Sequence, residues 1–148
     1  IECAKLAQKT NIPVILDAGS WKPQYAELIP LADTVICSSD FYPPNVVDNE
    51  SLFDYFEARK VKNAAISRGY KSILFNTERG RGEVPVKHTQ VVDTLGAGDF
   101  LHGAFCFYFL SSDFNFQTAL EKSSCLATFT CRFKGTRNWL NFSQGEIL

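Results

Sequence analysis

Short apolar runs alternate with helical patterns through the first half of the chain, and this alternation constrains the fold most strongly. Apolar runs of about four to eight residues between turn signals are typical of buried strands. Strands that alternate with helices indicate parallel pairing through crossover connections. This alternating order of strands and helices predicts an α/β fold, namely a three-layer αβα sandwich with a mostly parallel sheet. The expected strands are 13–17, 34–37 and 64–67, and the expected helices are 1–10, 23–31 and 50–59.

The pattern changes after a turn expected at 68–70. Two apolar stretches on either side of a glycine-rich turn predict an antiparallel hairpin. Two long apolar patterns near the C-terminus then predict a pair of helices. The expected hairpin strands are 72–76 and 83–86 around a turn at 77–82, and the expected helices are 97–110 and 116–132.

Residues 93–99, which read Asp-Thr-Leu-Gly-Ala-Gly-Asp, stand directly before the first of these helices. Small residues leave main-chain N–H groups uncovered at a helix N-terminus, which carries roughly +0.5 elementary charge and suits a phosphoryl group. The carboxylate of Asp99 would be repelled by a phosphate, so its position calls for a chemical reason. General-base catalysis supplies one, because the acid can take the proton of an attacking hydroxyl. The alternative is a tight turn in which Asp99 only favours the first helical turn.

This segment resembles the signature Asp-Thr-x-Gly-Ala-Gly-Asp of the PfkB (ribokinase-like) carbohydrate kinases, without a departure. The resemblance implies an ATP-dependent kinase acting on a hydroxyl of a small sugar. It also implies that Asp99 is the catalytic base and that the amides of Gly96, Ala97 and Gly98 form the anion hole.

The match covers only the C-terminal part of that longer family and is closer to its ketohexokinase-like branch. We therefore expect residues 1–148 to be the C-terminal portion of a single ribokinase-like domain, with little kinase activity alone. The family also implies a homodimer for the full-length protein.

The ends of the expected strands supply further candidates, because open α/β sheets bind ligands beyond the carboxyl ends of their strands. This rule places Asp17, Asp40 and Ser67 on the same rim as the 93–99 loop. Cys37-Ser38-Ser39-Asp40 stands where the family commonly carries Asn-x-x-Glu near magnesium. Asp40 can still hold hydrated Mg²⁺, whereas Cys37 is a poor substitute for an amide. A helix cap or an exposed loop acid is the alternative for Asp40.

The resemblance assigns cofactor-binding roles to two other pairs of residues. Ser67 and Gly69 stand at the family's Thr-x-Gly, which touches the phosphates and ribose, although an ordinary strand-ending turn explains them too. Asp93 and Thr94 shape the anion-hole loop and, in several family members, a site for K⁺ (potassium).

Three residues near the last helix are candidates for the adenine slot of ketohexokinase-like relatives, namely Ala127, Cys131 and Gly135. Packing within the helix core accounts equally well for Ala127 and Cys131. For His102, three residues after Asp99, packing at the helix start is the favoured interpretation.

The overall composition excludes several classes of function. A net charge of −1 without a basic stripe argues against nucleic acid as a partner. No apolar run approaches the roughly 18 residues of a membrane span. The five cysteines lack CxxC spacing, which argues against zinc and favours a reducing, cytoplasmic compartment. Two alternatives to the sugar kinase stay open: a nucleoside (adenosine-like) kinase of the same fold, and a nucleotide-binding regulator without catalysis.

Overall fold

A computed structural model describes residues 1–142. The chain divides into two compact units, Ile1–Glu83 and Val84–Leu148. The elements are α1 (Glu2–Lys9), β1 (Ile15–Ala18), α2 (Tyr25–Leu28), η1 (Ile29–Leu31), β2 (Thr34–Ser38), α3 (Asn49–Glu57), β3 (Asn63–Arg68), β4 (Lys71–Thr77), β5 (Gly80–Val84), α4 (Ala97–Ser111), α5 (Phe116–Thr130) and η2 (Asn138–Asn141), where η is a 3-10 turn.

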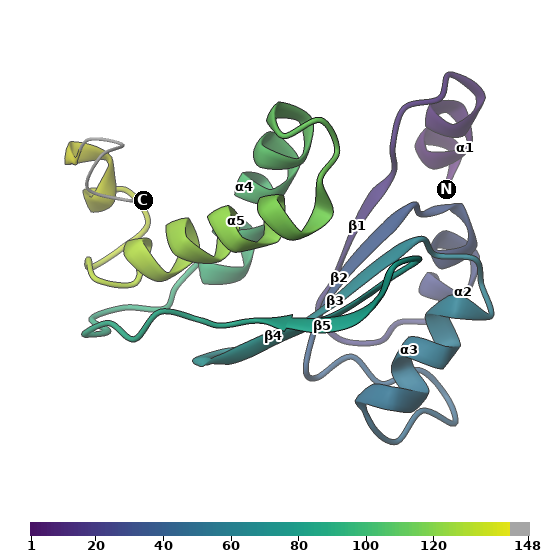
Figure 1. The fold of residues 1–148 in the computed structure, drawn as a ribbon, viewed down its shortest axis with the longest axis horizontal. Coiled ribbons are helices and arrows are strands. Elements are labelled where there is room, and N and C mark those ends of the chain that lie inside the picture. Colours follow the sequence, from purple (N-terminus) through teal and green to yellow (C-terminus); the bar gives the residue numbers. More distant parts are fainter. Residues whose placement is uncertain (143–148) are drawn as a thin grey trace. The chain divides into compact units, whose positions relative to one another are not determined.

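The described strands form one sheet in the order β1-β2-β3-β4-β5 (Figure 1). β1, β2 and β3 pair in parallel, as the alternating pattern predicted, and β4 pairs antiparallel with β3. A two-residue turn joins β4 to β5, which confirms the hairpin and makes the sheet mixed. Four consecutive residues of β2, 34–37, are buried, so both faces of this strand are covered, as in other parallel α/β sheets.

One face of the sheet forms the core of the first unit together with α2, η1 and α3. Successive residues of a strand point to opposite sides of the sheet, so every second side chain of each strand lies on this face. The helix α3 begins with a capping box, in which the Asp48 carboxylate accepts from Ser51 N at 2.8 Å and the Ser51 hydroxyl accepts from Asp48 N at 3.1 Å. Its apolar stripe is Leu52, Phe53 and Phe56, and the facing strand residues are Leu16, Ala18, Val35, Cys37, Ala64 and Ile66.

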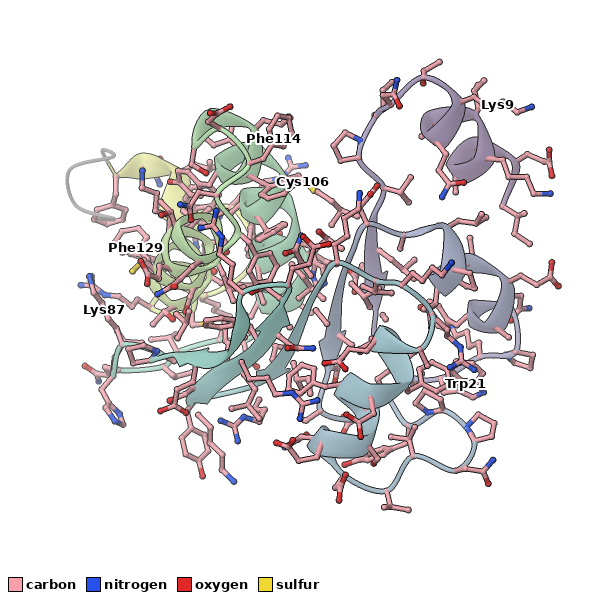
Figure 2. The ribbon with its side chains drawn as sticks, turned by 45° about the vertical axis from the view of Figure 1, so that its right-hand side comes forward. Lys9, Trp21, Lys87, Cys106, Phe114 and Phe129 are labelled. Carbon is pink, nitrogen blue, oxygen red and sulfur yellow. The ribbon has the colours of Figure 1, made fainter. Side chains whose placement is uncertain are left out.

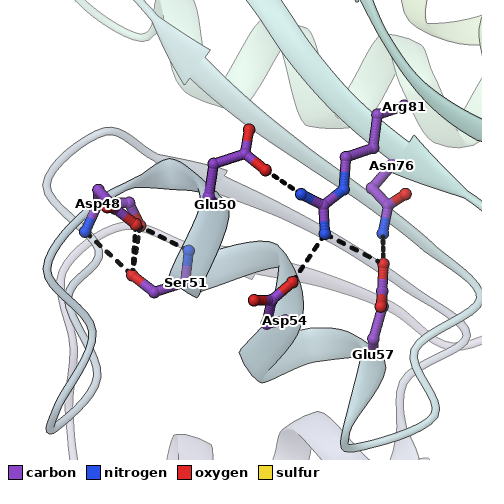
Figure 3. Close-up of polar contacts among 7 residues, drawn as sticks. All are labelled: Asp48, Glu50, Ser51, Asp54, Glu57, Asn76 and Arg81. Carbon is purple, nitrogen blue, oxygen red and sulfur yellow. Dashed lines mark hydrogen bonds and ion pairs between the residues drawn. The ribbon is translucent and has the colours of Figure 1, made fainter.

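Arg81 of β5 ties the hairpin to the exposed side of α3 (Figure 3). Its guanidinium pairs with Glu50, with Asp54 at 2.8 Å and with Glu57 at 3.3 Å. Asn76 of β4 donates to the same Glu57 carboxylate at 2.6 Å. These three acids raise the pKa of Arg81, with its hydrogen bond to Asp54 the largest cause. The three acidic side chains thus lie about one helical turn apart along α3, and all of them pair with Arg81.

Replacing Arg81 with Met is expected to lower the free energy of unfolding by about 1–2 kcal/mol. The expected loss of stability is small because exposed ion pairs contribute at most about 1 kcal/mol each and are screened by salt. Urea unfolding of the whole protein at low and high salt would measure it, with a smaller loss at high salt. Arg79→Met, on the neighbouring turn, is the control and should change little. Equal stability of both variants would contradict the bracing role of Arg81.

The second unit is built on α4 and α5, which pack against each other. Phe105 of α4 is fully buried and lies 5.2 Å from the Phe109 ring and 5.4 Å from the Phe116 ring. Near the end of α5, Phe129 (labelled in Figure 2) lies 5.2 Å from Phe133. None of the helices in residues 1–142 is both long enough and apolar enough to cross a membrane.

Two expectations about individual elements were wrong. The helix expected at 23–31 is a short α2 followed by η1, because Pro30 lacks the N–H that a continuing α-helix needs. The turn expected at 77–82 occupies only residues 78 and 79, and β5 is 80–84 where 83–86 was expected. Pro85 follows β5 directly and cannot donate to a sheet ladder.

Candidate active site

The loop before α4 makes a tight turn that requires glycine at position 96. Gly96 has φ 76° and ψ 5°, the conformation of the third residue of a type II turn. The turn is closed by a hydrogen bond from Ala97 N to Thr94 O at 3.1 Å. A Cβ on Gly96 would also lie 3.3 Å from the methyl group of Thr136. Any other residue at position 96 would therefore strain both the backbone and this contact.

Within residues 1–142, the first turn of α4 leaves several main-chain donors without a main-chain acceptor. The helical ladder begins with Phe100 N donating to Gly96 O at 2.9 Å, and no side chain of the described residues caps the start of the helix. Within residues 1–142, the N–H groups of Gly96, Gly98 and Asp99 donate to no main-chain oxygen. The Ala97 N–H, by contrast, is held by Thr94. Three N–H groups thus remain for an external anion, and that of Asp99 was not among those named from the sequence.

The Asp99 side chain lies beside this turn. It is exposed, and its Oδ2 stands 3.8 Å from the position that a Cβ on Gly96 would take. Within the described part of the chain, its carboxylate accepts no hydrogen bond and pairs with no cation. An exposed carboxylate next to unpartnered N–H groups can accept a proton beside an anion that those groups bind.

Asp93 braces the loop from the other side. Its Oδ1 accepts from Leu95 N at 2.9 Å, and its Oδ2 accepts from Gly135 N at 2.8 Å. Its own N–H donates to Cys131 O at 3.1 Å. The hydrogen bonds from Leu95 and Gly135, together with the charge of Lys134, hold the pKa of Asp93 below its usual range. Asp93 therefore joins the loop before α4 to the segment after α5.

Replacing Asp93 with Asn is expected to lower the melting temperature and kcat together, because Asn replaces one of the two accepting oxygens with an NH2 group that cannot accept from an N–H. The depressed pKa of Asp93 means that its stabilising effect is present above about pH 3.9, the ordinary Asp value, and is lost as the pH falls through the folded value. Thermal melts at pH 7 and pH 3 would check this. The variant should differ from the wild type at pH 7, and by less at pH 3, where part of the effect is lost. Asp113→Asn, an exposed control, should differ at neither.

The other candidates of the second unit gather near Asp93. The Cys131 thiol donates to Ala127 O at 3.2 Å, and Gly135 has φ 72°. Burial raises the pKa of the Cys131 thiol, and the nearby Asp93 adds to the effect. Ala127 is itself buried. The structure thus brings Cys131 and Gly135 together around the Asp93 carboxylate, with Ala127 one helical turn earlier.

The strand-end candidates of the first unit also lie together. The Ser67 hydroxyl donates to Cys37 O at 3.2 Å, and Ser39 N donates to Ser67 O at 2.9 Å. Gly69 has φ 63° in the turn from β3 to β4, next to a bulge between Ile66 and Arg68. Such bulges are frequent beside active sites.

Asp40 is the rim carboxylate that was assigned to a metal ion from the sequence. Asp40 is exposed, and its backbone N–H donates to the Ser38 hydroxyl oxygen at 3.1 Å. Within the described residues, no group of three or more His, Cys, Asp or Glu side chains could hold a metal alone. This donor set fits Mg²⁺, which keeps several waters and uses one or two carboxylates together with phosphates. Cys37 is fully buried, which raises the pKa of its thiol and makes it an unsuitable ligand.

The sequence predicted that Asp93 shapes this loop, but it revealed neither the link from Asp93 to Gly135 nor the hydrogen bond from His102 to the Gly98 carbonyl at 2.7 Å. Asp93 to Gly135 spans 42 residues, so no local pattern could reveal it. The spacing of His102 and Gly98 by four residues was a usable signal, because such residues face each other on a helix.

A family model described as pfkB family carbohydrate kinase matches residues 1–141. The deoxyribokinase of Salmonella typhi is 29% identical over 116 residues, which cover 69% of this chain and 38% of that protein. The fructokinase of Vibrio cholerae O395, solved with fructose, ADP and calcium, superposes with a TM-score of 0.83 at 18% identity over 99% of this chain and 53% of its own. The fructokinase of Xylella fastidiosa, solved with ATP, has a TM-score of 0.77 at 17% identity over 93% of this chain and 51% of its own.

These similarities confirm the expected ribokinase-like α/β fold. The chain spans about half the length of the solved relatives and 38% of the curated one.

Proposed function

The chain belongs to the pfkB family of carbohydrate kinases, and from this premise we propose that the whole protein transfers the γ-phosphoryl group of ATP to a hydroxyl of a small sugar. The observation that carries the proposal is the start of α4. There, three N–H groups without a main-chain acceptor in the described residues adjoin the exposed carboxylate of Asp99.

In this proposal the two parts of that site have different roles. Asp99 takes the proton from the sugar hydroxyl as the oxygen attacks phosphorus. The first-turn N–H groups of Gly96, Gly98 and Asp99 hold the charge that spreads over the phosphoryl oxygens. Ala97 contributes its small side chain and closes the turn through its own N–H. Phosphoryl transfer depends mostly on such positioning and charge stabilisation.

The nucleotide is assigned to the remaining candidates. Ser67 and Gly69 would contact its phosphates and ribose, and Ala127, Cys131 and Gly135 would line the adenine. Asp40 would hold Mg²⁺ through water. When bound, this ion supplies positive charge that neutralises the phosphate oxygens.

Three further features stay predictions of the same proposal. Potassium near Asp93 and Thr94 would reinforce a loop that Asp93 already braces through two N–H groups. The homodimer rests on the family resemblance alone. A cytoplasmic location is favoured by the five cysteines, which are all free thiols.

An acceptor panel tests the proposal. The full-length protein would be incubated with ATP, Mg²⁺ and deoxyribose, ribose, fructose or adenosine, with ADP release as the readout. Sugar-dependent ADP release is expected, whereas residues 1–148 alone, about half a kinase by length, should release little. Transfer to adenosine alone would favour the nucleoside kinase. Tight ATP binding by calorimetry without transfer to any acceptor would favour the regulator.

A further inference from the structure

His102 of α4 makes a hydrogen bond back to the loop that begins its own helix. Its ring Nδ1 lies 2.7 Å from the carbonyl oxygen of Gly98. A carbonyl oxygen can only accept a hydrogen bond, so Nδ1 must carry the hydrogen. The contact therefore fixes the protonation of this ring nitrogen.

The acceptor belongs to the peptide group that joins Gly98 to Asp99. The other polar end of this group is the Asp99 N–H, one of the three first-turn donors that have no main-chain acceptor within residues 1–142. A hydrogen bond to a carbonyl oxygen polarises the N–H of the same peptide group and strengthens it as a donor. His102 thus acts on an available N–H from the opposite end of the same peptide group.

Packing does little to fix this peptide group. Gly98 is exposed, and a Cβ added to it would meet no atom within 4 Å. Glycine also has the widest backbone freedom of any residue. Gly98 is the second residue of α4, so its carbonyl also belongs to the helical ladder, and the His102 ring adds a second restraint where no side chain packs.

We propose that His102 is a positioning residue for phosphoryl transfer, and that its Nδ1–H holds the Gly98–Asp99 peptide so that the Asp99 N–H points at the transferring phosphoryl group. This inference rests on the proposed function and adds to it a side chain that acts through a main-chain group. It differs from simple packing at the helix start, because it requires a hydrogen-bond donor at position 102.

Two substitutions separate a donor from a packing group. His102→Leu fills a similar volume without a donor, whereas His102→Asn keeps one, since its Nδ2 is bonded at the same distance from the backbone as the ring Nδ1. With ATP and whichever of deoxyribose, ribose or fructose reacts fastest, the Leu variant of the full-length protein should lose about tenfold in kcat, the low end for groups that orient a functional partner. Its KM for the sugar should stay unchanged, and the Asn variant should recover most of the loss. His88→Leu, at the other and exposed histidine, is the control.

A second measurement does not depend on turnover. Long-range ¹H–¹⁵N spectra of the wild type should show the His102 proton on Nδ1. The Asp99 amide resonance should shift in the Leu variant and return toward its wild-type position in the Asn variant.

Three results would overturn the inference. The first is a proton on Nε2 alone, and the second is an Asp99 amide resonance that does not shift in the Leu variant. The third is equal kcat in the wild type and the Leu variant. Failure of the proposed function would give another result: no acceptor would be phosphorylated, but the Asp99 amide resonance would still shift in the Leu variant.

Discussion

Replacing Asp99 with Asn is expected to lower kcat for sugar phosphorylation about 10²–10⁴-fold, the usual contribution of a general base. The amide has nearly the shape of the carboxylate but cannot take a proton from the attacking hydroxyl. The affinity for ATP should change much less, because the first-turn N–H groups of α4 are main-chain groups that the substitution leaves in place. Steady-state kinetics with the full-length protein, together with calorimetric titration of ATP, would measure both quantities.

The matched control is Asp113→Asn, the same chemical change just beyond the other end of α4. Asp113 is exposed and has φ 52°, a conformation that Asn adopts as readily as Asp. This variant should keep the wild-type kcat. Wild-type turnover by the Asp99 variant would remove the base from the proposed mechanism, even if the acceptor panel had shown kinase activity.

The sequence predicts the order of elements well because most of its signals are local. Apolar runs bounded by turns located the three parallel strands, and the capping residue Asn115 lies directly before the second long helix, where its side chain accepts from Thr118 N at 2.9 Å. The errors arose where two local signals compete. Pro30 divides an otherwise continuous helical pattern, and glycines at 80 and 82 lie within β5 where the sequence suggested a wide turn.

The candidate site was predicted as a set of residues, whereas its hydrogen bonds could not be. Gly96 was expected to leave its amide uncovered, and the structure adds that its positive φ closes a turn that engages the Ala97 N–H. Which main-chain N–H groups remain available to bind an anion depends on the backbone dihedral angles. The residue types favour certain angles but do not determine them. The rim residues Asp40 and Ser67 belong to one compact unit and the 93–99 loop to the other, so their common role in binding ATP stays a proposal.

Replacing Phe41 with Ala is expected to lower the free energy of unfolding by about 3–5 kcal/mol, a large share of the 5–15 kcal/mol that typical proteins have. Phe41 is fully buried directly after Asp40, with ring centroids 5.2 Å from Tyr25 and 5.6 Å from Trp21. Its truncation would leave a cavity that these rings cannot fill without moving. Urea unfolding of the full-length protein measures the loss, and Tyr42→Ala, at a neighbouring ring that is 50% exposed, should cost much less. A Phe41 variant as stable as the Tyr42 variant would mean that this aromatic cluster does not anchor the rim, and the position assigned to Asp40 would lose its structural support.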